Sequence, residues 1–190
     1  MKTVSMSGSP RQNVGKKDAK ELRKNKMVPC VLYGGEKQYH FSISEKNFNP
    51  VIFSPYTFII DLEVEGKKFK TVLQEVQYHP VADNILHVDF LEIKEDKPVV
   101  INLPVRISGV SPGVLRGGKL VNKYRKLKVK GIVSKLPDLI DVSINELEVG
   151  DAIKVGDIKI EGVELLESPR NIVVTVQSAR NMVAEEPAKK

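Results

Sequence analysis

The chain has 190 residues, of which 41% are hydrophobic and 28% charged, and a single cysteine. This length exceeds what one small domain needs, so two modest domains are expected. One cysteine excludes an internal disulfide, and no apolar run approaches membrane-spanning length, so we expect a cytoplasmic protein. Because Cys30 lies in an apolar run, we interpret it as a small buried hydrophobe and not as a nucleophile.

The charge of the chain is unevenly distributed. The net charge is +6, which favours an acidic partner such as nucleic acid. Residues 1–26 hold eight Lys/Arg against two Asp/Glu, residues 106–135 hold nine Lys/Arg and no acid, and residues 136–190 hold eleven acids against six bases. Two basic regions and an acidic end indicate an oriented charge pattern on the protein surface.

A strand at residues 2–7 and a helix at residues 16–25 are the first expected elements. The helix carries a set of cationic side chains, three of which recur every fourth residue: Lys16, Lys17, Lys20, Arg23 and Lys24. Like charges at this spacing destabilise a helix, which suggests that phosphate groups neutralise them. The alternative is a solvated helix face, which Asp18 and Glu21 partly support.

Five further strands are expected in the first half, near residues 29–34, 38–43, 56–64, 67–78 and 84–93. Ser44 is a natural cap for a short helix before the break at residues 47–50. Glu65-Gly66-Lys67 gives a clear turn signal between two of the strands.

Two polar residues in the last of these strands, His87 and Asp89, are expected on one face, with Leu86, Val88 and Phe90 on the other. A carboxylate on a phosphate-facing surface would be repelled unless it accepts from a donor, and base edges supply donors. The alternative is a local structural pair on a barrel rim. A catalytic pair is disfavoured because no nucleophile motif or metal-ligand cluster accompanies it. His40 and His79 are interpreted as structural.

The charged, proline-ended segment at residues 94–98 is the best expected domain boundary. Beyond it, alternating segments at residues 98–108, 119–133, 139–144 and 171–177 give an all-β pattern. We therefore expect a mainly β protein with a few short helices: a domain at residues 1–94, a second all-β domain at 95–180, and a flexible or helical tail at 181–190.

Residues 113–120 match the phosphate-loop spacing except at the last position, where Leu120 replaces the magnesium-binding Ser or Thr. The residues that follow look like a strand and not like the helix whose N-terminus would hold phosphate. A glycine-rich turn between strands is the better interpretation, and no cofactor is expected.

Several of these motifs together resemble a known family, the bacterial large-subunit ribosomal protein L-twenty-five, in its two-domain form related to the general stress protein Ctc. The resemblance in the first half lies in Arg11, Gly15-Lys16-Lys17, Leu22-Arg23-Lys24, Val28-Pro29-Cys30-Val31-Leu32-Tyr33-Gly34, Gln77 and His87-Val88-Asp89-Phe90. In the second half it lies in Gly113-Val114, Gly117-Gly118, Leu139-Ile140-Asp141-Val142-Ser143 and Leu147-Glu148-Val149-Gly150-Asp151.

The resemblance implies a non-enzymatic protein of the central protuberance of the large subunit. Its N-terminal six-stranded barrel would bind 5S rRNA on the widened minor-groove side of an internal loop. It further implies a protein that is monomeric when free, with neighbouring ribosomal proteins as possible partners of the C-terminal domain. The implied RNA contacts are Arg11, Arg23, Tyr33, His87 and Asp89, and the implied phosphate contacts are Lys16, Lys17 and Lys24. Two further RNA-binding residues are expected: Lys20, from the basic side of the same helix, and Gln77, from the residues that carry the resemblance. The A-form minor groove is wide and shallow, so a barrel surface can read it.

One position departs from the family, which usually has a glycine where this chain has Lys26. A lysine in the left-handed conformation costs on the order of 1 kcal/mol, so a different helix end is expected. The alternative function is a stress protein that binds tRNA or another RNA away from the ribosome, because this barrel type resembles the anticodon-binding region of glutaminyl-tRNA synthetase.

Overall fold

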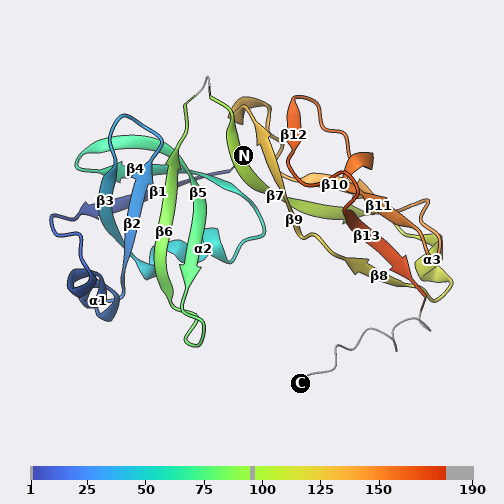
Figure 1. Ribbon diagram of the computed structural model, residues 1–190, viewed down its shortest axis with the longest axis horizontal. Coiled ribbons are helices and arrows are strands. Elements are labelled where there is room, and N and C mark those ends of the chain that lie inside the picture. Colours follow the sequence, from blue (N-terminus) through green and yellow to red (C-terminus); the bar gives the residue numbers. More distant parts are fainter. Residues whose placement is uncertain (1, 95–96, 179–190) are drawn as a thin grey trace. The chain divides into compact units, whose positions relative to one another are not determined.

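A computed structural model describes residues 2–94 and 97–178 of the chain (Figure 1). Its backbone divides into two compact units, the first comprising the chain up to Ile101 with Ile132–Asp138, the second Asn102–Gly131 and the chain from Leu139 onwards. The expected tail at residues 181–190, and part of the expected boundary at 94–98, lie outside the described residues. The mainly β architecture with few short helices confirms the expected fold class.

Six strands of the first unit form a closed barrel in the order β1-β3-β2-β6-β5-β4. The barrel strands are β1 (Lys2–Pro10), β2 (Met27–Tyr33), β3 (Tyr39–Ser44), β4 (Phe58–Val64), β5 (Lys67–Tyr78) and β6 (Ile85–Glu92). The pairs β1–β4 and β2–β6 are parallel, and the other neighbours are antiparallel. In this closed order β5 separates β4 from β6, so the outer faces centred on β4 and on β6 point in different directions.

Aromatic and aliphatic side chains fill the barrel. Phe41, Phe48 and Phe90 are fully buried, and the rings of Phe48 and Phe90 have centroids 6.3 Å apart. Phe48 comes from the 3-10 helix η1 (Glu45–Phe48), which runs directly into α2 (Asn49–Ile52), so these two short helices close the core. Cys30 belongs to this core and is fully buried, as expected.

The turn between β4 and β5 is formed by Glu65 and Gly66, with φ of 53° and 74°. Two consecutive positive φ values are those of the type I′ turn that joins twisted antiparallel strands most easily. The expected hairpin is therefore confirmed.

The helix α1 (Lys16–Lys24) packs against β2 near one end of the barrel (Figure 1). It ends with Asn25 as C-cap, and Lys26 follows with φ 57°. The expectation of a different helix end is wrong, because Lys26 itself takes the left-handed conformation. The amide of Lys26 donates to the carbonyl of Arg23 at 3.1 Å, which closes the helix.

The second unit contains two sheets, with orders β10-β7-β9-β12 and β11-β13-β8. The strands are β7 (Val99–Ser108), β8 (Lys119–Asn122), β9 (Lys126–Gly131), β10 (Ile140–Ser143), β11 (Ala152–Lys154), β12 (Val163–Leu165) and β13 (Ile172–Gln177). The short helices of this unit are α3 (Pro112–Leu115) and η3 (Val155–Asp157), whereas η2 (Val133–Lys135) belongs to the first unit. The single strand expected at 119–133 is wrong, since β8 and β9 belong to different sheets.

The segment that matches the phosphate-loop spacing is a structural turn. Ser111 caps the four-residue helix α3 by accepting from the amide of Val114, and Gly113 lies against the backbone of Glu148 and Val149. The strand β8 follows, with no helix whose N-terminus faces the turn. The glycines serve close backbone packing at this position.

Candidate nucleic-acid interface

The outer face of strands β2, β6 and β5 carries four of the expected site residues. The register of β5 and β6 sets Gln77 opposite His87 and Glu75 opposite Asp89, and β2 sets Val31 beside Asp89. Tyr33 lies two residues further along β2, on the same face by the alternation of strand side chains. Val88 and Phe90 point the other way and are fully buried. The shared face of His87 and Asp89 is therefore confirmed.

The predicted position of Leu86 is wrong. Leu86 is only half-buried, and Ile85 is the buried residue at this end of β6. The register between β5 and β6 shifts between Gln77 and Tyr78, so the strict alternation stops there. A bulge of this kind re-aims the residues around it, and it leaves the carbonyl of Leu86 available to another element.

His87 and Asp89 form a hydrogen-bonded pair. Nδ1 of His87 lies 2.7 Å from Oδ1 of Asp89, and the side chains are 30% and 24% exposed. A carboxylate only accepts, so the imidazole donates through Nδ1 and its Nε2 is left for another partner. Oδ2 of Asp89 is also left as an acceptor. The pair can thus offer acceptors to the donor groups of a bound molecule.

Tyr33 shares this environment. Partial burial raises the pKa of Tyr33, and the negative charges of Asp89 and Glu75 raise it further. The phenol therefore stays neutral at and well above neutral pH, where it can donate a hydrogen bond or stack on a base. Glu75 was not among the expected site residues, although it lies two positions before Gln77, on the same strand.

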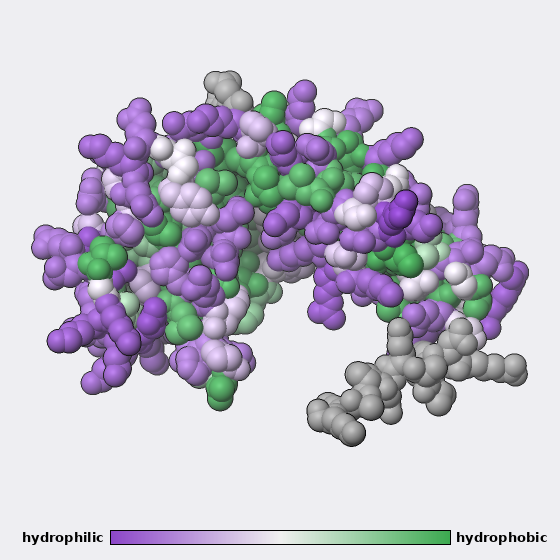
Figure 2. All heavy atoms as spheres, in the orientation of Figure 1, coloured by the Kyte–Doolittle hydropathy of each residue, from purple (hydrophilic) through white to green (hydrophobic). Residues whose placement is uncertain are grey.

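The helix α1 presents its cations on one side. At about 100° per residue, Lys16, Lys17, Lys20, Arg23 and Lys24 fall within roughly a third of the helix circumference. All five are exposed, whereas Asp18, Ala19 and Leu22 on the remaining arc are half-buried. Figure 2 shows the corresponding part of the barrel unit, at the lower left, covered by hydrophilic residues.

Arg23 connects this helix to the strand face. Its Nε donates to the carbonyl of Leu86 at 3.0 Å, next to His87 in β6. This single hydrogen bond joins residues 63 positions apart and holds the basic side of α1 beside the polar face of the barrel.

A depression of about 530 Å³ lies where α1 meets the end of β6. Its cations are Lys20, Arg23, Lys24 and Lys26, with Glu45 as the one acid among the lining residues. Lys26 was missed by sequence reasoning because its orientation depends on the left-handed turn. His79 also lines the depression, and its Nδ1 accepts from the amides of Val81 and Ala82, which supports its structural interpretation.

Arg11 is placed differently from the other expected contacts. Its guanidinium pairs with Asp18 of α1, its side chain is 8% exposed, and its amide donates to the carbonyl of His40 at 3.0 Å. Arg11 thus fastens the start of α1 to the barrel. The expected RNA contact of Arg11 requires that a phosphate displaces Asp18 or approaches another edge of the guanidinium.

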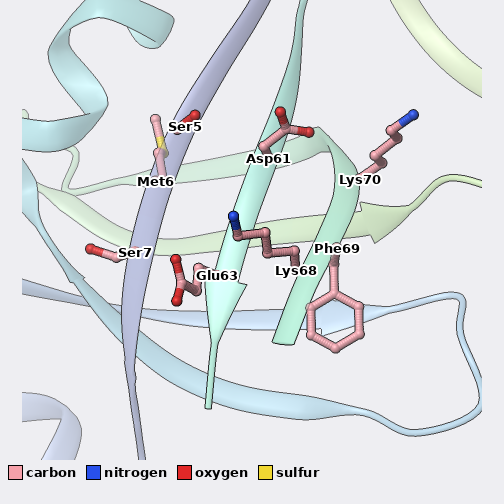
Figure 3. A pocket seen from close by; sticks show the side chains of 8 residues that line it. All are labelled: Ser5, Met6, Ser7, Asp61, Glu63, Lys68, Phe69 and Lys70. Carbon is pink, nitrogen blue, oxygen red and sulfur yellow. The ribbon is translucent and has the colours of Figure 1, made fainter. Parts of the chain in front are cut away.

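Another outer face, centred on β4 and including β1 and the first part of β5, has a second depression of about 530 Å³ (Figure 3). Cross-strand rows there join Ser5 to Asp61 and Lys70, and Ser7 to Glu63 and Lys68. Two carboxylates thus offset the two lysines, and such a surface has no preference for a polyanion.

No group of His, Cys, Asp or Glu within residues 2–94 and 97–178 is arranged to hold a metal ion. In the same part of the chain, no helix has the length and apolarity needed to cross a membrane.

Comparisons with known proteins place both halves of the chain. Residues 6–90 match the Ribosomal L25p family, and residues 98–180 match the C-terminal domain of ribosomal protein TL5. The large ribosomal subunit protein bL25 of Cytophaga hutchinsonii is 45% identical over 188 residues, covering 99% of this chain and 98% of that protein. The bL25 proteins of Azobacteroides pseudotrichonymphae and Porphyromonas gingivalis are 42% and 41% identical, and cover 95% of this chain with 96% and 95% of their own lengths.

Identity at this level over nearly the whole chain confirms the resemblance, including its two-domain form. The family consists of structural proteins of the bacterial ribosome, which is cytoplasmic, and not of enzymes. The chain therefore belongs to the L25p family of large-subunit ribosomal proteins, in the form that carries a TL5-type C-terminal domain.

Proposed function

We propose that this chain binds 5S rRNA in the large ribosomal subunit through its N-terminal barrel. The observation that carries the proposal is the hydrogen bond from Arg23 to the carbonyl of Leu86, which fixes a basic helix beside a face of hydrogen-bonding side chains. Such a surface combines two functions that RNA recognition needs, which are neutralisation of phosphates and selection of bases.

Phosphate contacts come from α1 in this proposal. Lys16, Lys17, Lys20 and Lys24 are exposed and can follow the backbone of an RNA strand. Lysine is a flexible point charge, so these contacts give affinity and set the orientation without reading sequence. Arg23 keeps its Nε on Leu86 and can direct its other guanidinium N–H groups to RNA.

Base contacts come from the strand face. Oδ2 of Asp89 can accept from an amino group of a base, and Nε2 of His87 and the amide of Gln77 extend the row of polar atoms. Tyr33 supplies a neutral phenol on the same face. In the shallow minor groove of A-form RNA, base edges and 2′-hydroxyls are accessible to short side chains of this kind.

The proposed RNA-binding residues also indicate which domain binds the RNA. Every side chain assigned to RNA lies before residue 94, so we propose that residues 1–94 carry the 5S rRNA affinity and that residues 95–180 form a separate domain. A fragment covering the barrel should then keep most of the affinity of the full chain.

The proposal is tested by competition. Purified full-length protein should bind 5S rRNA in a complex that an excess of tRNA does not displace, and the affinity should fall steeply as salt rises. Sucrose-gradient fractionation should find the protein with large subunits. Displacement by tRNA at equal concentration, or a protein that sediments apart from the subunits, would instead favour an RNA-binding stress protein that acts off the ribosome.

A further inference from the structure

The second unit carries a cationic strand face that the contacts proposed above do not use. In β9 the side chains alternate strictly: Leu127 and Val129 are fully buried, whereas Lys126, Lys128 and Lys130 are exposed on the other face. Alternate residues of a strand are about 7 Å apart, so the three ammonium groups form a regular row. Lys123 and Arg125, both exposed, precede this row directly.

Two arginines of this region are already neutralised by acidic partners. Arg106 makes two hydrogen bonds to Asp141, at 2.5 and 2.8 Å, and Arg116 pairs with Glu148. On the face of β9 itself, Lys130 lies 3.6 Å from Glu164 of β12. Within the described residues, neither ammonium group of Lys126 and Lys128 has a hydrogen-bond or ion-pair partner. Lys126 and Lys128 thus place two uncompensated charges side by side on one strand face, next to the exposed Lys123 and Arg125.

Protection of a sheet edge does not explain this row. Lysines on edge strands prevent sheets from pairing with other chains, but β9 lies inside its sheet, between β7 and β12. The amide of Leu166 donates to the carbonyl of Lys128, so the segment that follows β12 covers the backbone of β9 there as well. Like charges about 7 Å apart on one face of a strand repel one another, and an anionic ligand would remove that cost.

We propose that the outer face of β9 is a second RNA-binding site, which holds the phosphate backbone of a nucleic acid strand without reading its sequence. The row lacks the buried aromatic or arginine anchors of protein interfaces, which are depleted in lysine. Regularly spaced lysines match regularly spaced phosphates, and they bind as point charges.

The test uses the full chain with Lys16, Lys20 and Lys24 changed to Gln, so that α1 contributes little to the affinity for RNA. The probe is a perfectly paired RNA duplex that lacks any internal loop. Adding K126Q, K128Q and K130Q should weaken duplex binding roughly tenfold or more at low salt, and should reduce the slope of log K against log salt by about two. A matched triple, K119Q, K154Q and K159Q, removes the same charge elsewhere in the unit and should change affinity less than about twofold.

Three outcomes overturn the proposal. The β9 triple could bind the duplex as tightly as its parent, or the matched triple could lose as much affinity, which would indicate a general effect of net charge. Tighter binding of polyglutamate than of the duplex, lost in the β9 triple, would identify an acidic protein segment as the ligand. Urea unfolding midpoints of all variants establish that each one is folded. The duplex titration does not depend on 5S rRNA recognition by the barrel, so the two proposals fail separately.

Discussion

Replacing Asp89 by Asn distinguishes two possible roles of this side chain, which are recognition of an RNA base and positioning of His87. The hydrogen bond between Nδ1 of His87 and Oδ1 of Asp89 is 2.7 Å long, and about a quarter of each side chain is exposed. Hydrogen bonds to charged groups contribute roughly 1.5–3 kcal/mol, and solvent competition at this exposure reduces the value to about 1 kcal/mol. If Asp89 also accepts from a base edge, losing that contact costs a further ~1–3 kcal/mol of discrimination.

A double-mutant cycle distinguishes the two roles. Affinity is measured for Asp89→Asn, His87→Gln and the double variant, on a 5S rRNA fragment with its native internal loop and on one with an altered loop. If Asp89 only braces His87, its replacement has no effect once His87 is already changed. We expect instead a residual loss of about fivefold or more on the native loop, which corresponds to ~1 kcal/mol.

Glu75→Gln provides the matched control. Glu75 lies opposite Asp89 on β5, so its replacement removes one negative charge from the same face without touching the His87 pair. We expect unchanged or slightly tighter RNA binding for this variant, because a repulsive charge is removed. The reasoning is refuted if Asp89→Asn binds as tightly as wild type, or if Glu75→Gln loses as much discrimination.

Three further predictions concern the helix and the core. Lys20→Ala and Lys24→Ala should each lower the salt slope by about 0.7–0.9 and weaken all RNA targets alike, measured by salt titration; a loss confined to native 5S rRNA would contradict their role as phosphate contacts. Lys26→Gly should stabilise the fold by about 1 kcal/mol in urea unfolding relative to Lys26→Ala, which loses the same charge but keeps the left-handed strain; equal stabilities would mean that the turn is unstrained. Burial raises the pKa of the Cys30 thiol, so Cys30 should react with thiol reagents only at the rate of barrel unfolding; rapid labelling of the folded protein would show an open barrel.

The strands of the barrel were largely predictable because their pattern is local. Alternation of apolar and polar residues marked β4, β5 and β6, and Glu65-Gly66 marked the turn. The division of residues 119–133 into two strands was not predicted, because no glycine or proline marks the break at residues 123–125. Only the tertiary contacts, in which β8 pairs with β13 and β9 with β12, assign the two segments to different sheets.

The candidate site shows the same limit. Strand alternation was enough to bring His87 and Asp89 together, and helix periodicity grouped the lysines of α1. Pattern reasoning could not anticipate the bulge at Leu86, because the sequence around a bulge has no periodicity that identifies it. For the same reason it missed the Leu86 carbonyl as the anchor of Arg23, and it did not foresee that Arg11 pairs with Asp18.

The most direct test of 5S rRNA binding by the face of β2, β6 and β5 compares it with the face centred on β4. One variant carries Tyr33→Ala, Gln77→Ala and His87→Ala, and the other carries Ser5→Ala, Asp61→Asn and Lys70→Gln on the face of Figure 3. Dissociation constants for 5S rRNA are measured for both, together with urea unfolding midpoints. We expect the first to bind roughly a hundredfold more weakly, from three contacts of about 1 kcal/mol each, and the second to bind as wild type. Equal affinities for the two folded variants would contradict the proposed interface.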